Sequence, residues 1–222
     1  MKVHRIKITS WTSSFRYPNV ISGYQPTFYV PPISTVLGII NACAGFYNSF
    51  DNIELGYYFD YTAKATDLET VYQISVDSKG APKNQVKANV LNREFLLECR
   101  LYLYLKDNRL VDYFRYPRFQ ILLGRSNDLA TIEEIKECEL VEKENANMIR
   151  GQIVPFMGNF LPGTIQALPK YFTDTIPRNN IGTEAYSVIP YDSDSFPTKL
   201  KAYSDYIDNK EVDIYFHQLN FG

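Results

Sequence analysis

The most regular part of this chain is residues 94–106, EFLLECRLYLYLK, in which two kinds of side chain alternate. Alternation with a period of two is typical of a β-strand, because successive side chains point to opposite faces of the sheet. One face is apolar and consists of Phe95, Leu97, Cys99, Leu101, Leu103 and Leu105. The other is polar and aromatic and consists of Leu96, Glu98, Arg100, Tyr102, Tyr104 and Lys106. The pattern predicts a sheet with its core on one side.

A hairpin is expected just before this strand. Residues 71–76 and 85–90 are short β-type runs on either side of a polar, turn-rich centre, DSKGAPKN, at residues 77–84. Two such runs around a turn signal predict paired antiparallel strands. The centre is too polar for a protein core. We therefore expect a long hairpin, or thumb, over about residues 72–92 that projects from the sheet.

The segment 23–46, GYQPTFYVPPISTVLGIINACAGF, combines an aromatic, proline-stiffened arm with an apolar helix. The helix is expected from about Ser34 to Ala44, with Ser34 as N-cap, Thr35 beside it and Gly45 as the C-terminal stop. The first N–H groups of a helix lack internal partners and lie at its positive end, so they can bind phosphate. The alternative is that Ser34 caps a buried helix and has no other role.

The order of the expected elements indicates the fold class. The chain is expected to begin with a strand at 2–8, followed by the helix, a strand at 53–65, the thumb and the strand at 94–106. A connector and a last strand follow within 110–124. This order predicts an α+β fold with an RRM- or ferredoxin-like domain at residues 1–126. Residues 128–145 are compatible with a helix or a short strand. The remainder, within 127–222, is interpreted as a small β-rich unit.

Charge is distributed unevenly between the two halves. Residues 1–125 carry 15 Lys and Arg against 10 Asp and Glu, whereas residues 126–222 carry 8 against 15. An anionic partner would prefer the first half, and the acidic half suits solvent or a basic protein neighbour. The three cysteines are odd in number and widely spaced, which favours reduced thiols in a cytoplasmic protein. No signal peptide or membrane-spanning run is expected.

Binding is better supported by the sequence than catalysis. His4 and His217 are the only histidines, and no motif for a metal, a cofactor or a nucleophile is visible. Point charges on a flexible hairpin suit backbone phosphates. The alternatives are a solvated loop and structural ion pairs with Glu94, Glu98 or Asp112. The basic candidates are Lys79, Lys83 and Lys87 on the thumb, Arg93 at its base, and Arg16, Arg115, Arg118 and Arg125 elsewhere.

Four segments together resemble one protein family. They are SFRYP at 14–18, YVPPISTVLGIINACAGF at 29–46, NVLNREFLLECRLYL at 89–103 and LGRSND at 123–128. In order and spacing they are similar to family five of the CRISPR-associated (Cas) proteins, in the RAMP superfamily, and most similar to its type I-B members. The resemblance covers most of residues 10–128.

This resemblance implies a non-catalytic, RNA-binding subunit of a type I crRNA-guided surveillance complex (Cascade) in antiviral defence. Such a subunit caps the end that holds the 5′ handle of the crRNA. Its implied partners are the backbone subunit, the large subunit and a processing ribonuclease, with target DNA near the PAM contacted indirectly. No membrane contact is implied. The implied RNA-binding residues are Arg16, Tyr24, Ser34, Thr35, Lys79, Lys83, Lys87, Arg93, Arg118 and Arg125, with Tyr24, or Tyr102 and Tyr104, as stacking platforms.

Two other functions remain open from the sequence. One branch of the family cleaves pre-crRNA with a Tyr, Lys and His set in which Lys and His are adjacent, and no such pair occurs here. A metal-independent endoribonuclease is therefore the alternative to a binding subunit. A weaker alternative is an aromatic-rich β protein that binds sugars. The binding subunit is the favoured interpretation.

Overall fold

The computed structural model describes residues 1–20 and 23–221, and strands dominate this part of the chain. It contains two α-helices, α1 (Ile33–Ala44) and α2 (Asn108–Arg115). The strands are β1 (Lys2–Ser13), β2 (Tyr24–Gln25), β3 (Ile53–Asp60), β4 (Ala63–Val76), β5 (Pro82–Leu105), β6 (Ala130–Glu139), β7 (Val141–Lys143), β8 (Gln152–Pro155), β9 (Thr164–Pro169), β10 (Thr183–Ile189), β11 (Ala202–Ile207), β12 (Lys210–Ile214) and β13 (Phe216–Leu219).

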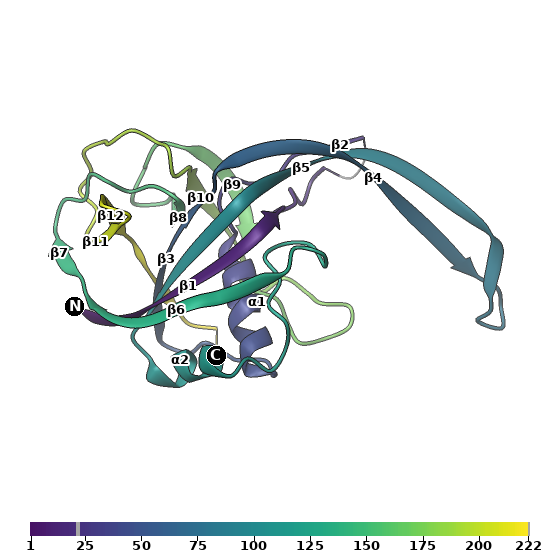
Figure 1. Cartoon of the computed structure of the whole chain (residues 1–222), viewed down its shortest axis with the longest axis horizontal. Coiled ribbons are helices and arrows are strands. Elements are labelled where there is room, and N and C mark those ends of the chain that lie inside the picture. Colours follow the sequence, from purple (N-terminus) through teal and green to yellow (C-terminus); the bar gives the residue numbers. More distant parts are fainter. Residues whose placement is uncertain (21–22, 222) are drawn as a thin grey trace.

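One large sheet organises the molecule, with the strand order β13-β3-β5-β1-β6 (Figure 1). Neighbouring strands along this path are antiparallel. The helix α1 lies between β1 and β3 in the chain, and α2 lies between β5 and β6. Each helix therefore connects two parallel strands that are separated by a third, which is the split βαβ arrangement. The predicted strand at 94–106 is the part of β5 at the centre of this sheet.

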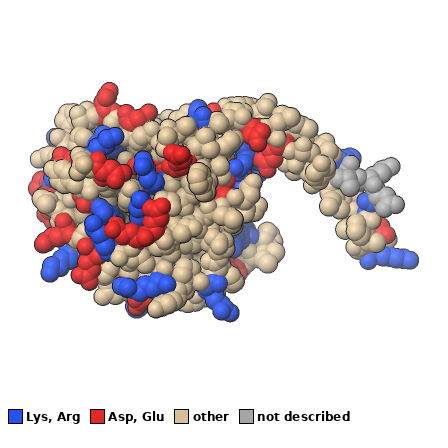
Figure 2. Space-filling model, viewed as in Figure 1, with Lys and Arg blue, Asp and Glu red and all other residues tan. Residues whose placement is uncertain are grey.

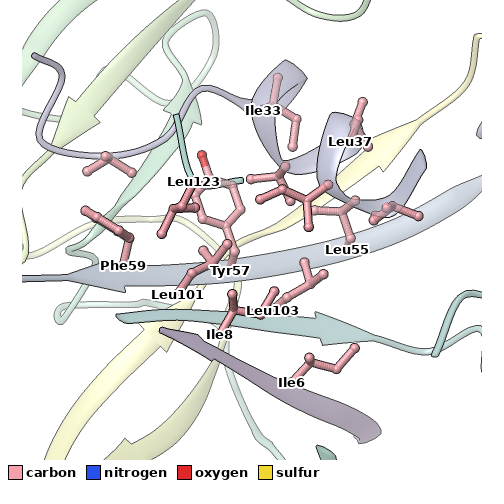
Figure 3. Close-up of a cluster of buried hydrophobic side chains, with 14 of the residues drawn as sticks. Ile6, Ile8, Ile33, Leu37, Leu55, Tyr57, Phe59, Leu101, Leu103 and Leu123 are labelled. Carbon is pink, nitrogen blue, oxygen red and sulfur yellow. The ribbon is translucent and has the colours of Figure 1, made fainter. Parts of the chain in front are cut away.

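The helix α1 packs on one face of the sheet and forms the main core with it. Figure 3 shows Ile33 and Leu37 of α1 over Leu55 and Tyr57 of β3. Leu101 and Leu103 of β5 belong to the same buried cluster, as the alternating pattern predicts. The helix is apolar around most of its circumference and is buried for that reason.

The ends of α1 correct one prediction and confirm another. The N-cap is Pro32, whose carbonyl accepts from the N–H of Thr35 at 2.9 Å, so Ser34 lies inside the first turn and is not the cap. Proline favours the first positions of a helix because its fixed φ suits them. Gly45 ends the helix with φ 81°, and its N–H donates to Asn41 O at 2.8 Å. Glycine tolerates this left-handed conformation, as expected for a C-terminal stop.

The opposite face of the sheet is covered in part by a small sheet of β12, β11 and β7. Tyr102 and Tyr104 of β5 are buried beneath it, at 3% and 0% exposed. The prediction that these two rings offer stacking platforms is therefore wrong. They pack with Ile207 and Val212 of the small sheet, because strands from the C-terminal region supply apolar partners for them. A third sheet, β8-β10-β9, contributes to the core on the α1 side.

Strand pairing crosses the division expected at residue 126. The strands β6 and β13 follow this point in the chain, yet β6 pairs with β1 and β13 pairs with β3. The expected division does not coincide with a boundary between sheets. Residues 110–124 also differ from expectation, because α2 ends at Arg115 and Leu122 forms only an isolated bridge to Leu129. The strand that follows α2 in the chain is β6, in the stretch left open between helix and strand.

A two-stranded ribbon of β4 and β5 projects from the body (Figure 1). The pairing runs from Ala63↔Leu97 at the root to Val76↔Pro82 near the tip. The structure therefore contains the predicted hairpin, but its paired strands extend beyond residues 72–92 at both ends. At about 3.3 Å per residue, the sixteen residues 82–97 span roughly 50 Å. The β5 strand thus continues from the sheet into the ribbon.

Candidate nucleic-acid interface

A cluster of polar and aromatic side chains lies at the root of the ribbon, around the carboxylate of Glu94. Tyr24 OH donates to Glu94 Oε1 at 2.5 Å, and the N–H of Thr27 donates to Oε2 at 3.2 Å. Lys64 Nζ lies 3.0 Å from Oε1 and also donates to Tyr29 OH at 3.1 Å. We call these five residues the root cluster. Its outward groups are the Tyr24 ring, which is 48% exposed, and the Lys64 ammonium.

The charges of the root cluster are fixed near neutral pH. Burial alone raises the pKa of the Glu94 carboxyl, but hydrogen bonds from Tyr24 and Lys64 outweigh burial and hold that pKa below its ordinary value. Hydrogen bonds to Tyr29 and Glu94 raise the pKa of Lys64 above its ordinary value. Lys64 is therefore a permanent cation and a poor general base. A fixed cation beside a half-exposed ring suits a phosphate next to a stacked base.

The ribbon beyond the root cluster has two different faces. On β4 the even-numbered residues share one face, since side chains alternate along a strand. That face carries Leu68, Tyr72 and Ile74, which are 64 to 66% exposed, and the cross-strand residue Val90, which is 50% exposed. The other face is polar and includes the Gln73↔Lys87 pair. An apolar face without a cover is an interaction surface, because such area is costly in water.

The three predicted lysines lie along the outer half of this ribbon, and all are exposed. Lys87 lies opposite Gln73, and Lys83 follows Pro82, the outermost paired residue of β5. Lys79 is in the tip turn, where its N–H donates to Asp77 Oδ1. Residues 70–92 contain one aspartate against these lysines. Figure 2 shows basic side chains near the end of the arm, whereas both charges are mixed over the body.

Two predicted arginines are already engaged in ion pairs. Arg93 donates to Glu69 across the ribbon, and its side chain is 11% exposed. Arg125 binds Asp128 through Nε at 3.0 Å and Nη2 at 2.9 Å and lies over the Phe95 ring. Breaking either pair would leave an uncompensated charge, since the Arg93 side chain and the Asp128 carboxylate are buried. These two side chains therefore support the root of the ribbon.

The remaining predicted residues are divided between two regions. Arg16 is exposed and pairs with Thr27 in an isolated bridge, so its backbone adjoins the root cluster. Arg118 is at the other end of α1, where its N–H donates to Cys43 O and its side chain packs over Gly45. Ser34 and Thr35 are half-buried in the first turn of α1. The structure thus brings Arg16 and Tyr24 together at the root, and Arg118 is not with them.

The two histidines lie in one row across the sheet, far from the ribbon. His4 pairs with Leu105, Leu105 with Leu55, and Leu55 with His217. Three strand spacings separate them by about 14 Å. Along β5, eight residues separate Leu105 in this row from Leu97 at the root of the ribbon, a distance of roughly 27 Å. Neither imidazole is therefore within reach of the root cluster.

Lys64, Tyr29 and Glu94 were not among the residues predicted to bind RNA. Their sequence separation gives no local signal, because Lys64 and Glu94 meet only through the pairing of β4 with β5, and Tyr29 comes from the segment before α1. Extending the predicted pairing of 71–76 with 85–90 toward the sheet places residue 66 opposite 95, one residue away from the observed register. The apolar face of the ribbon did have a signal, since Leu68, Tyr72 and Ile74 recur with even spacing.

Two further findings concern the described residues only. Within 1–20 and 23–221, no three His, Cys, Asp or Glu side chains are grouped so that they could hold a metal ion. Neither helix in these ranges has the length and apolar character needed to cross a membrane.

Comparison with known proteins finds solved structures with a similar fold but does not assign the chain to a family. No protein-family model matches the sequence, and no curated protein matches it. A chain of a solved CRISPR RNA-guided surveillance complex is similar with a TM-score of 0.56 and 13% identity, covering 88% of this chain and 91% of that one. A chain of the type III-B Cmr-beta complex bound to cognate target RNA and AMPPnP has a TM-score of 0.54 and 11% identity, covering 88% and 86%. A chain of Cmr-beta with cognate target RNA alone has a TM-score of 0.54 and 12% identity, covering 87% and 86%.

Proposed function

We propose that this protein is a non-catalytic subunit of a type I CRISPR RNA-guided surveillance complex and that it binds the 5′ handle of the crRNA. The observation that carries the proposal is the root cluster at the base of a projecting ribbon, on a fold shared with chains of CRISPR RNA-guided complexes. A fixed lysine cation and a half-exposed tyrosine ring can grip a phosphate and a base of a single strand.

The finer assignment rests on the sequence motifs. The segments at 14–18, 29–46, 89–103 and 123–128 support Cas family five in the RAMP superfamily, type I-B, with an RRM-like domain that carries the thumb. In this assignment the backbone subunit, the large subunit and a processing ribonuclease are neighbours in a cytoplasmic complex. The uncovered apolar face of the ribbon supports contact with such neighbours, since exposed apolar area marks interaction sites.

The non-catalytic role is proposed over the endoribonuclease alternative on two grounds. Metal-independent RNA cleavage needs a general base near the 2′-OH, and histidine most often supplies it. His4 and His217 are on a row of the sheet roughly 27 Å from the root of the ribbon, and Lys64 is held as a cation by Glu94.

A binding and cleavage assay with the full chain tests this proposal. The protein is mixed, in EDTA, with a labelled RNA that carries the 5′ handle from the CRISPR repeat of the same genome, and with a scrambled RNA of equal length. We expect salt-dependent binding that favours the handle and leaves the RNA intact on a denaturing gel. Equal binding of the scrambled RNA contradicts handle recognition. Cleavage by substoichiometric protein contradicts the non-catalytic role and supports the endoribonuclease.

A further inference from the structure

The outer face of the large sheet is covered at one end and open at the other. Along β1 the odd-numbered residues share this face. Arg5 is 9% exposed and binds Asp205 of β11 at 2.8 Å, whereas Trp11 is 83% exposed. The same gradient runs along β5, from the fully buried Tyr104 to the exposed Glu98. The small sheet of β7, β11 and β12 therefore stops short of the place where the ribbon leaves the body.

An apolar row occupies the open end of this face. Trp11, Leu129 and Leu122 are 83%, 59% and 36% exposed. Ser10 Oγ donates to Leu129 O at 2.9 Å and joins the end of β1 to the segment before β6. Leu129 and Leu122 form a bridge, and directly opposed residues of an antiparallel pair share a face. The row thus extends over three segments of the chain.

A cavity of about 350 Å³ adjoins the row, and Trp11 and Leu129 form part of its wall. Its polar lining includes Thr9, Glu98 and Arg100. Glu98 has a φ of 51°, in the left-handed region that a side chain rarely adopts within a strand. Backbone strain of this kind is found where a structure positions a group for function. The cavity is large enough for one bulky side chain of a partner.

The free charge in this cavity is negative. Lys7 Nζ lies 2.6 Å from Glu133 Oε2, and Arg100 Nε lies 2.5 Å from Asp60 Oδ1, so both cations that line the cavity are paired. Glu98 forms no salt bridge with the described part of the chain. An unpaired carboxylate repels a phosphate and attracts an ammonium or guanidinium group. The lining therefore favours a basic protein segment over a nucleic acid.

We infer that Trp11, Leu129, Leu122 and Glu98 form a docking site for a partner protein, which inserts an apolar side chain flanked by lysine or arginine. Exposed tryptophans are frequent energetic centres of protein interfaces because they bury a large area. The carboxylate of Glu98 sets the charge of the segment that fits. This site is separate from the proposed RNA contacts of the root cluster and does not depend on them.

Trp11 is the single tryptophan of the chain, so its fluorescence reports on this site directly. The full chain is titrated with a short peptide in which leucine alternates with lysine. Three other probes are used: a peptide with glutamate in place of lysine, one with serine in place of leucine, and a single-stranded RNA. We expect a saturable blue shift of the emission with the lysine–leucine peptide only, because burial removes water from the indole.

Charge reversal near the tryptophan separates a specific site from general attraction to an acidic protein. We expect Glu98→Lys to weaken binding of the lysine–leucine peptide by about tenfold or more. The control is Glu139→Lys, at another exposed carboxylate, on β6 and outside the cavity, which is expected to leave the affinity unchanged. Glu98→Gln removes the charge without adding a bulky cation and is expected to give an intermediate affinity.

Five results overturn the inference. Four of them are a blue shift with RNA alone, a shift with the serine peptide as large as with the leucine peptide, equal loss of affinity in both lysine variants, and no shift with any probe. A shift that grows with the concentration of the protein alone, accompanied by a larger mass in solution, shows a second copy of the chain as the occupant and also overturns it. None of these results bears on handle binding at the root cluster.

Discussion

Lys64 of β4 and Glu94 of β5 form an ion pair, with Nζ 3.0 Å from Oε1, where the ribbon leaves the body. The same carboxylate accepts from Tyr24 OH at 2.5 Å, so one buried acid positions both the cation and the ring of the proposed RNA contact. Positioning by a shared partner makes the two groups interdependent, because a change in Glu94 disturbs both.

Lys64→Ala is expected to weaken binding of the handle RNA about tenfold. The substitution removes a fixed cation and leaves the Glu94 carboxylate, 9% exposed, facing the RNA without a counter-charge. Titration of labelled RNA at constant salt, followed by filter binding, measures the effect. Far-UV circular dichroism of the variant shows whether the sheet is retained.

Lys106→Ala is the matched control for this variant. Lys106 directly follows β5 of the large sheet, pairs with Glu54 and lies over the Phe216 ring. Its side chain is 39% exposed, against 38% for Lys64. It is at the opposite end of β5 from the root cluster. Equal losses of RNA affinity in the two variants contradict the proposed contact at Lys64.

The lysines of the ribbon are expected to contact phosphates and therefore to affect the salt dependence of binding. Replacing Lys79, Lys83 and Lys87 together by Gln should make the negative slope of log K against log salt shallower by about 2. Each phosphate contact on a single strand contributes about 0.7 to the magnitude of this slope, and three contacts are lost. The loss of affinity should be similar for the handle and a scrambled RNA, since phosphates carry no sequence information.

The control replaces three exposed lysines of the body, Lys136, Lys199 and Lys210, by Gln, which changes the net charge equally. Binding isotherms at several salt concentrations give the slope for each protein. An unchanged slope in the ribbon variant, or the same change in the control, shows that the ribbon does not carry the phosphate contacts.

Local patterns were sufficient to predict the central strand, the helix and the ribbon. Alternation identified residues 94–106, and the turn residues between two β-type runs identified the hairpin. The alternation breaks at Glu98, where φ is 51°. Before this residue the faces are exchanged, so Leu96 is in the core with Cys99 and Leu101, and the predicted Phe95 and Leu97 are not. A single residue in the left-handed region reverses the faces of a strand, and no local pattern announces it.

Contacts between distant segments could not be predicted from the sequence. Tyr102 and Tyr104 looked like an open aromatic face, and strands about a hundred residues later in the chain bury them. The same holds for the root cluster, whose residues Tyr24, Lys64 and Glu94 come from three elements. Long-range pairing decides which polar groups meet, and periodicity within one element carries no information about it.

Gly151→Ala is expected to destabilise the fold by about 2 kcal/mol or more. Gly151 has φ 62°, and an added Cβ would lie 2.5 Å from Phe59 O and 2.6 Å from the Tyr58 ring. Its own carbonyl accepts from the Phe59 N–H at 2.7 Å, so this corner cannot move away from β3 without losing that bond. Denaturant unfolding of both proteins gives the difference.

Gly158→Ala is the control for backbone strain alone. Gly158 has φ 85°, and apart from Gly158 and its two chain neighbours no atom of the described chain lies within 4 Å of its Cβ position. The Gly158→Ala variant is expected to lose about 1 kcal/mol of unfolding free energy, the usual cost of a positive φ for alanine. If both variants lose the same free energy, then steric contact with β3 contributes nothing and the close approach at Gly151 is unimportant.

The free energy of unfolding is expected to fall between about pH 6.5 and pH 4 because of His217. Its ring is buried, stacks on Tyr57 with ring centroids 5.8 Å apart and meets Tyr215 edge-on at 5.0 Å. Burial lowers the pKa of this imidazole from 6.5 to about 4, and a hydrogen bond with the backbone of Ile153 opposes that shift only weakly.

Because the folded protein holds His217 neutral, the unfolded chain binds the extra proton first as the pH falls. The contribution of His217 to stability is therefore complete above pH 6.5 and is lost as the pH falls toward 4, a total of about 3 kcal/mol. His217→Gln keeps a side-chain hydrogen-bond donor but does not titrate, and the carboxylates are common to both proteins. The difference between the two unfolding free energies, measured in urea across this range, should follow that loss, and a constant difference would show that folding does not lower the pKa of His217.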